Sequence, residues 1–504
     1  MSVRGKEDLY LILDISPSHI SAGLGLGDVL QRPRHTIKLL AGLPTDLPSW
    51  TWQDLLVGQA LDDAMSSDST LTLIRPFEHI LEPDSAPRQT AGMTAEQASL
   101  TALEAILQHL MFGLLSMPAR PLGYHLIVLP PAGLPYSYSE GITRLVFERL
   151  YLPALAIYER PLAQLYALGY TSGLAVDIDA TGTEINVVLD NQVQPQARVR
   201  CPIGSDDCDR YLADLLLRAD PQLPALLAPD GEVSPGGIQA ALLAIVSSLK
   251  DQDAIKFASE LLDLNHVAPG MSEAVQSAAV TEGTEEGEFD IARLVAQGKV
   301  DALVRGKTSG EATPSTEDVV SVPHPLRPDG PEISIGPIRH RYAEPLFDPS
   351  LIINDGPSAS TGQSLSLQEA AALSVSSLEA PMRPSAWDIV CVTGPPSRIP
   401  GLSVDQRMSS LLTASAGVAS AVIKAASQYL IDPESGSDTQ ARVARLGKIP
   451  DYFSEMKDHP DLAAYLGGAI LAKITFSANV GAYLSKQDYN LKGPAIVKLL
   501  DPVN

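Results

Sequence analysis

One pattern that occurs twice limits the possible folds of this chain more than any other feature: an apolar strand containing an Asp, a polar turn, and a second strand. Residues 10–30 read "YLILDISPSHISAGLGLGDVL", with Asp14 near the end of the first strand. Residues 173–193 read "GLAVDIDATGTEINVVLDNQV", with Asp177 in the same place. Such a duplication predicts two similar lobes that face each other across a cleft, each presenting a hairpin turn to it. Two unrelated hairpins would show the same pattern.

Strands and helices alternate in the N-terminal part of the chain. We expect three strands in apolar runs that end at turn residues, over 8–16, 20–31 and 124–131. A helix is predicted over 94–115, where Thr94 and Gln97 form a capping box and leucines recur at helical spacing. Since 504 residues are too many for one ordinary core, the alternation predicts an α/β protein of two or more lobes.

The later part of the chain has weaker patterns. Helices are predicted over 238–250 and 254–264. Three stretches are poor in apolar side chains and rich in small, acidic or turn-forming residues: 269–290, 306–330 and 432–442. Such segments cannot bury enough apolar surface to offset the entropy lost on ordering. We therefore predict disordered or loop inserts, with an interaction tail as the alternative for the acidic first one.

Composition excludes several classes of protein. The net charge of −24 argues against a broad nucleic-acid surface, which needs clustered Lys and Arg. Three cysteines without a CxxC pair indicate a reducing compartment, and the nine histidines show no zinc-ligand spacing. No apolar run reaches the roughly 18 residues of a membrane span, and the N-terminus does not resemble a signal peptide. We expect a soluble intracellular protein that contacts neither membrane nor nucleic acid directly.

Several stretches resemble the actin-related protein family of the actin–hexokinase–Hsp70 superfamily, and they follow one another in the family's order. They are "EPLFDPS" within 324–352, the run 146–179 that leads into the second hairpin, and "YLGGAILAKITF" and "SKQDYNLKGP" within 463–497. The resemblance implies an α/β, actin-like two-lobed fold in which two similar domains face a central cleft. Residues 1–167 and 463–504 would form the first lobe, and residues 168–462 with the inserts would form the second.

A narrower resemblance concerns "KIPDYFSEMKD" (448–458), the final "YNLKGPA" and residues 289–304. These are similar to the actin-related protein 9 subfamily, subunits of SWI/SNF- and RSC-type chromatin remodellers. The resemblance implies a non-catalytic nuclear subunit that docks on the helicase/SANT-associated (HSA) helix of a Snf2-type motor ATPase, beside a second actin-related protein. Two alternatives stay open: an actin-related subunit of another assembly, such as the dynactin pointed end, and a nucleotide-binding ATPase or sugar kinase.

The first hairpin departs from the actin pattern for binding phosphate. In actins, two glycines after the Asp let backbone N–H groups approach the anion. Here Asp14 remains, but Ser16 and Ser18 replace the glycines, and Pro17 between them has no N–H to donate. Ser21 stands where actins have a lysine that reaches the phosphate. The hairpin is therefore expected to keep its shape without its phosphate chemistry.

The second and third nucleotide elements depart in the same way. Asp177 matches the acid of the second actin hairpin, but "DAT" replaces its Gly-Asp-Gly, which places Asp179 where a phosphate would sit. Of the glycine pair below the adenine ring, Gly394 remains and two prolines follow it. The residues of this degenerate nucleotide cleft are Asp14, Ser16, Ser18, Asp177, Asp179, Thr183 and Gly394.

The catalytic positions of actins are also replaced. Arg160 aligns with the glutamine that orients the attacking water, and Glu184 aligns with its assisting histidine. Because an arginine only donates hydrogen bonds, it cannot orient water in that way, although it could stabilise phosphate charge. We expect Asp14 and Asp177 to bind turn amides, with a residual magnesium–nucleotide contact as the alternative. We predict no catalysis and no cofactor.

A partner groove is implied by the resemblance at the base of the actin fold. Tyr166 and Gly169, near the end of one helix, would face Leu471 and Ile474 on the helix over 467–476. An amphipathic helix such as an HSA helix would dock there through spaced apolar anchors. Ordinary core packing is the equal alternative for Leu471 and Ile474.

Overall fold

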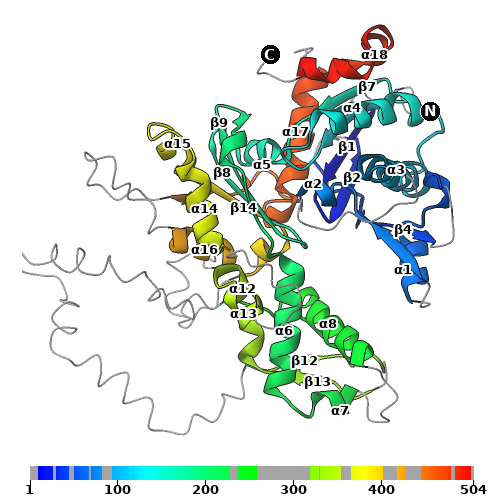
Figure 1. Ribbon diagram of the computed structural model, residues 1–504. Helices are drawn as coiled ribbons and strands as arrows, with labels where there is room; N and C mark the ends of the chain where they lie inside the picture. Colours follow the sequence, from blue (N-terminus) through cyan, green and yellow to red (C-terminus); the bar gives the residue numbers. More distant parts are fainter. Residues whose placement is uncertain are drawn as a thin grey trace, which may run out of the picture. The chain divides into compact units, whose positions relative to one another are not determined.

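Figure 1 shows a computed structural model of the chain. It describes residues 9–25, 30–44, 50–66, 70–81, 93–121, 123–227, 235–257, 318–327, 330–353, 365–400, 417–426, 444–477 and 483–500. The chain divides into two compact units, Met1–Tyr211 with Tyr342–Asn504, and Leu212–Arg341. The lobe boundaries predicted from the sequence divide the chain differently and stay a prediction. The expected inserts 269–290 and 432–442 lie outside the described residues.

The first unit contains two large mixed sheets. In order across the first sheet, the strands are β16 (Leu484–Ser485), β7 (Ala154–Ile157), β6 (His125–Leu129), β1 (Tyr10–Ile15), β2 (His19–Leu24) and β3 (His35–Lys38). The second sheet contains β10 (Gln192–Val193), β9 (Thr183–Leu189), β8 (Gly173–Ile178), β14 (Ile389–Thr393) and β15 (Arg445–Leu446), and β11 (Val199–Cys201) also pairs with β9. β4 (Ala41–Pro44) and β5 (Leu71–Ile74) form a separate pair.

The two sheets repeat one arrangement, which confirms the duplication read from the sequence. β1 pairs with β2 antiparallel and with β6 parallel. β8 pairs with β9 antiparallel and with β14 parallel. All residues of β1, β8 and β9 are buried, as expected for central strands covered on both faces. Both Asp residues therefore come from central strands that begin a hairpin.

The helices of the first unit surround these sheets. In chain order they are η2 (Trp52–Asp54), α1 (Gln59–Ser66), α2 (Glu78–Leu81), α3 (Ala95–Gln108), η3 (His109–Leu114), α4 (Tyr136–Arg144), η4 (Leu145–Arg149), α5 (Arg160–Leu168), η5 (Pro195–Ala197), α6 (Ser205–Ala219, which begins in this unit), α12 (Glu344–Phe347), α13 (Ser350–Ile353), α14 (Leu367–Ser376), α15 (Arg383–Trp387), η8 (Pro395–Arg398), α16 (Val418–Ala426), η10 (Pro460–Leu462), α17 (Ala463–Ser477), α18 (Lys486–Lys492) and η11 (Pro494–Leu500). Among the described residues, no helix is long and apolar enough to cross a membrane.

Helices α5 and α17 lie side by side and belong to one core that includes strands of both sheets (Figure 1). Their close approach depends on the paired glycines of α17. A Cβ atom on Gly467 would lie 1.7 Å from the carbonyl oxygen of Ala163, so only glycine fits there. This contact holds α5, and with it Arg160, next to the strands that carry the two Asp residues.

The predicted N-terminal elements are confirmed, with two changes in extent. Thr94 and Gln97 form the expected capping box, and α3 then continues into the π-helical turn η3 up to Leu114. The strand predicted over 20–31 is shorter: β2 ends at Leu24, and Gly25 adopts a positive φ of 82°. Such a conformation ends a strand and is accessible to glycine at low cost.

The second unit contains α7 (Leu223–Leu227), α8 (Pro235–Asp251), the antiparallel pair β12 (Val320–Val322) and β13 (Ile333–Ile335), and η7 (Pro337–Arg341). α8 confirms the helix predicted over 238–250. Two expectations were wrong in part. Residues 254–257 are not helical, and the insert predicted over 306–330 contains β12, because Val320 and Val322 alternate with Ser321 despite the Pro- and Ser-rich surroundings.

Candidate functional site

Arg160 joins the two hairpins through their Asp residues. It is the first residue of α5, and its side chain, like those of Asp14 and Asp177, is buried. Its Nε donates a hydrogen bond to Oδ1 of Asp14 at 2.6 Å, and its Nη1 donates to Oδ2 of Asp177. A single guanidinium thus binds one carboxylate from each sheet.

This contact corrects the expectation that Asp14 and Asp177 bind turn amides. The first turn is closed by other groups: the N–H of Ser16 donates to the carbonyl of His19 at 2.9 Å, and the N–H of His19 donates to Oγ of Ser16 at 2.9 Å. In the second turn, the N–H of Asp179 donates to the carbonyl of Gly182 at 2.9 Å. None of these turn bonds uses the side chain of Asp14 or Asp177, and both hairpin acids bind Arg160.

A second polar link connects the hairpins at their turns. Oγ of Ser18 donates to Oδ1 of Asp179 at 2.7 Å, and it also lies 2.5 Å from Nδ1 of His19. Asp179 is buried, with an exposed fraction of 5%. The two positions at which the sequence departs most clearly from a phosphate-binding hairpin, Ser18 and Asp179, therefore bind each other.

Strand β14 completes the cluster from the other side of β8. Oγ1 of Thr393 donates to Oδ1 of Asp177 at 2.8 Å, and Nε2 of Gln164 donates to Oγ1 of Thr393 at 2.9 Å. Gly394 has a φ of 88°, and a Cβ atom there would lie 1.9 Å from the carbonyl oxygen of Ile178. Gly394 thus allows close packing of the strand ends, while Thr183 donates to the carbonyl of Ile203 at 2.8 Å.

Glu184 also takes part in an internal ion pair. Its Oε1 accepts a hydrogen bond from Nη1 of Arg200 at 3.0 Å. Burial raises the pKa of Glu184 to about 7, although Arg200 opposes this shift. Glu184 therefore pairs with Arg200 beside the buried acids Asp177 and Asp179.

Electrostatics explains why Arg160 remains charged in a buried site. Burial lowers its pKa, but the attraction of Asp14 and Asp177 outweighs burial and raises the pKa above its ordinary value. For Asp14, burial raises the pKa and Arg160 lowers it. A buried ion pair is costly to disrupt because removal of one partner leaves an uncompensated charge.

A magnesium-bound phosphate does not fit this cluster. Arg160 occupies both carboxylates that could face a metal ion, and Asp179 adds a negative charge beside them. In the described part of the chain, no three His, Cys, Asp or Glu side chains come together as a metal site. These residues form ion pairs and hydrogen bonds with one another.

The four residues of the predicted partner groove fall into two groups. Tyr166 is half-buried, and Leu471 is 4% exposed within the core shared by α5 and α17. Gly169 ends α5 with a φ of 79° and is exposed, and Ile474 is 45% exposed. Leu471 therefore packs in the core, while Gly169 and Ile474 face solvent.

The function of Arg160 was not recognised from the sequence. The sequence signal for it was an imbalance of charge. The two hairpins contain three acids, Asp14, Asp177 and Asp179, and Ser21 stands at the position where actins have a lysine. Buried carboxylates need a cation or donor, and Arg160 was the basic residue already assigned to the same cleft.

The fold agrees with the comparison to known proteins. The family model described as Actin matches residues 98–499, and the chain therefore belongs to the actin family. It is 25% identical over 419 residues to "SWI/SNF and RSC complexes subunit arp9" of Schizosaccharomyces pombe, covering 79% of this chain and 76% of that protein. It is 22% identical over 388 residues to "SWI/SNF and RSC complexes subunit arp42" of the same organism, covering 75% of this chain and 76% of that protein.

A third relative is named as an actin-related protein without mention of those complexes. The chain is 21% identical over 393 residues to "Actin-related protein 2" of Drosophila melanogaster, covering 78% of this chain and 75% of that protein. The predicted actin-like fold and the predicted resemblance to actin-related subunits of SWI/SNF and RSC complexes are both confirmed.

Proposed function

We propose that this chain is a non-catalytic actin-related subunit of a SWI/SNF- or RSC-type chromatin remodelling complex. The observation that carries the proposal is the binding of Arg160 to both hairpin acids, because these are the groups that would face phosphate and metal in an actin. The similarity to two Schizosaccharomyces pombe subunits of such complexes supports the choice of assembly. The ATPase alternative would require this ion pair to open.

The partner in this proposal is the HSA helix of the Snf2-type motor, with a second actin-related protein beside it. The exposed side chain of Ile474 and the open surface at Gly169, beside half-buried Tyr166, support an apolar contact with that helix. The net charge of −24 would attract a basic helix and speed its association. The protein would act in the nucleus, where its partner binds chromatin.

A pull-down tests this proposal directly. The full chain is mixed with a purified HSA helix, with and without magnesium ATP, and the complex is then denatured and assayed for released nucleotide. We expect binding that is independent of ATP and no stoichiometric nucleotide. Binding that requires ATP, or one nucleotide released per chain, would contradict the non-catalytic assignment. Co-purification with dynactin subunits and not with a Snf2-type motor would contradict the choice of assembly.

Two matched substitutions locate the contact. Ile474→Glu introduces a charge at the proposed groove, and we expect it to abolish capture by the HSA helix. Leu373→Glu, on α14, makes the same kind of change at a residue of similar exposure, 49% against 45%. It should leave capture unchanged. Equal effects of the two substitutions would place the HSA helix elsewhere.

A further inference from the structure

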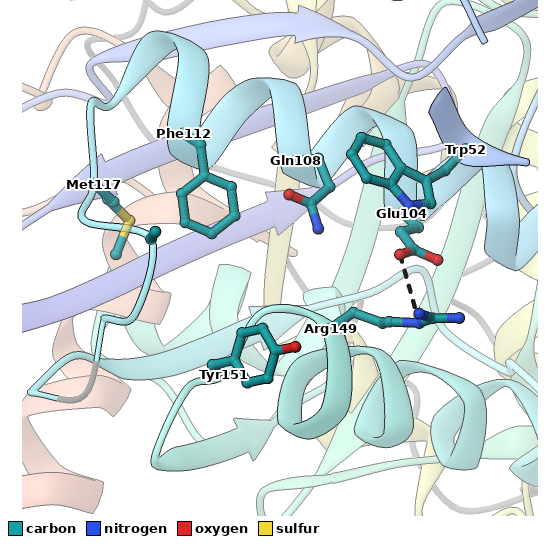
Figure 2. A pocket seen from close by; sticks show the side chains of 8 residues that line it. Trp52, Glu104, Gln108, Phe112, Met117, Arg149 and Tyr151 are labelled. Atoms are coloured by element: carbon teal, nitrogen blue, oxygen red, sulfur yellow. Dashed lines mark ion pairs between the residues drawn. The ribbon is translucent and has the colours of Figure 1, made fainter. Parts of the chain in front are cut away.

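A groove of about 480 Å³ opens on the first unit, away from the hairpin cluster. Figure 2 shows side chains from three segments of the chain around it. Its lining consists of Trp52, Glu104, Gln108, Phe112, Met117, Ala119, Arg149 and Tyr151. None of these residues belongs to the Arg160 cluster or to the proposed HSA groove. The groove is therefore a separate surface.

Three of the eight residues that line the groove are aromatic. Trp52 belongs to η2, Phe112 to η3, and Tyr151 to the loop after η4. Tyr151 is 51% exposed, and Figure 2 shows its ring across the groove from Phe112 and Gln108. Aromatic rings bind the apolar stem of a long side chain and, through their faces, attract a cation.

Glu104 places an acid in this aromatic groove. It lies on α3 and is 9% exposed. Its Oε1 has no hydrogen-bond donor among the described residues, and burial raises the pKa of its carboxyl group. Nε of Arg149 lies 3.7 Å from this oxygen, beyond hydrogen-bond distance, and the Arg149 side chain is 64% exposed. Because Arg149 is exposed and makes no hydrogen bond to this oxygen, it can turn into solvent and give its place to another cation.

The backbone at the groove is strained on two sides. Ser116, next to Met117, has a φ of 50°, and Tyr151 has a φ of 57°. Residues other than glycine adopt this left-handed conformation at a cost of about 1 kcal/mol or more. The second of these conformations positions an exposed aromatic ring at the edge of the groove.

We propose that this groove docks a basic segment of a protein partner, which places a lysine or arginine side chain beside Oε1 of Glu104. The stem of that side chain lies along Phe112 and Tyr151, and its charged end binds Glu104 in place of Arg149. The net charge of −24 favours a basic partner over an acidic one or a nucleic acid. The surface goes beyond the proposed function, since it shares no residue with the proposed HSA groove.

The test uses two short peptides that differ in one charge. Each carries a fluorophore and a leucine on either side of a central residue, which is lysine in one and norleucine in the other. Binding to the full chain is measured by fluorescence anisotropy, and the methyl resonance of Met117 in methionine-labelled protein locates the site. We expect the lysine peptide to bind roughly tenfold more tightly, because its ammonium group can donate a hydrogen bond to Glu104 and norleucine cannot. We also expect it to shift the Met117 resonance.

Three substitutions test the assigned partners. Glu104→Gln should weaken the lysine peptide roughly tenfold, while Glu379→Gln, the same change at an exposed site on the same unit, should not. Arg149→Ala should strengthen binding by about threefold, because it removes the competing cation. Equal binding of both peptides, an unmoved Met117 resonance, or weaker binding after Arg149→Ala would each overturn the proposal.

Tyr151→Gly keeps the proposal testable if Glu104→Gln does not fold. Glycine accepts the left-handed conformation at Tyr151, so the fold should be retained while the ring is lost. We expect the lysine peptide to lose most of its affinity for this variant. Unchanged affinity would show that the aromatic wall takes no part in binding.

Discussion

The hairpin cluster and the aromatic groove both pair an arginine with a buried carboxylate, but with opposite results. Arg160 is itself buried and donates to Asp14 at 2.6 Å. Arg149 is 64% exposed on its side chain and lies 3.7 Å from Glu104. In the first site, Arg160 and both hairpin acids hydrogen-bond one another within the protein. In the second, the arginine makes no hydrogen bond to Oε1 of the carboxylate.

This difference distinguishes a site that stabilises the fold from a site that can bind another molecule. A closed network stabilises one arrangement of the two sheets, because each of its charges would be costly if a partner left. A pair whose cation is exposed and makes no hydrogen bond can exchange that cation for another. The hairpin cluster is therefore the closed site, and the proposed binding surface lies elsewhere on the same unit.

The largest expected effect is on the closed cluster. Arg160→Gln introduces the residue that actins have at this position, but it leaves Asp14 and Asp177 buried without their cation. We expect the free energy of unfolding, measured by chemical denaturation, to fall by about 3–5 kcal/mol. Because the N–H groups of Ser16 and Asp179 are bonded within the hairpins and Pro17 has none to donate, we expect no ATP hydrolysis to appear.

The matched change on the open site is Arg149→Gln. It removes the same charge from an exposed side chain that makes no hydrogen bond to its acid, so the free energy of unfolding should fall by less than in Arg160→Gln. Similar losses for the two variants would show that burial does not distinguish the sites. A gain of hydrolysis in Arg160→Gln would show that one residue alone had switched off an intact nucleotide site.

The next effect is the dependence of stability on pH through Glu184. Its pKa is raised from 4.5 to about 7 in the folded protein, so the folded state binds its proton more tightly than the unfolded state does. This contribution to stability is present below pH 4.5 and is lost as the pH rises to about 7. We expect its loss to lower the free energy of unfolding by about 3 kcal/mol.

The test compares the protein with Glu184→Gln at the two ends of that pH window. Glutamine cannot titrate, so its variant should lose less stability over the window than the original protein does. Asp14, whose pKa burial also raises, is common to both proteins and cancels in the comparison. Parallel pH profiles would mean that Glu184 does not carry this proton.

A smaller effect is expected at the turn of the first hairpin. Ser18→Ala removes the hydrogen bond to Asp179, whose Oδ2 has no partner among the described residues. The free energy of unfolding should fall by about 1–3 kcal/mol, as for other buried acceptors that lose a donor. Ser21→Ala, on the same hairpin, removes an exposed bond to Thr36 and should cost less than about 0.5 kcal/mol. Reversal of this order would show that the link between hairpins is weak.

Much of the first unit could be predicted from the sequence because its signals are local. The capping box at Thr94 and the apolar strands that carry Asp14 and Asp177 are short-range patterns, and each confirmed element follows from one of them. The strand β12 was missed since its three residues pair with β13, a contact between separate segments. The many turn-forming residues around Val320 led to the prediction of a loop in place of the alternating strand Val320–Val322.

The candidate site shows where such local reasoning ends. The loss of phosphate-binding residues at Ser16, Ser18 and Asp179 can be read position by position. Their replacement by an internal network cannot, because it depends on which side chains meet across two sheets: Ser18 contacts Asp179, and Arg160 contacts both hairpin acids. Likewise, Glu104 reads as a helix surface residue until packing buries it beside Trp52 and Phe112.

The smallest expected effect concerns the backbone of the open groove. Tyr151→Gly and Tyr151→Ala both remove the half-exposed ring, and they differ only in the Cβ atom and in chain freedom. At most positions alanine is the more stable of the two, but at a φ of 57° the order should invert. We expect the glycine variant to be more stable by roughly 0.5–1 kcal/mol in thermal or chemical unfolding. A more stable alanine variant would mean that the ring is held at the groove without strain, and the contrast with the hairpin cluster would then rest on Glu104 and Arg149 alone.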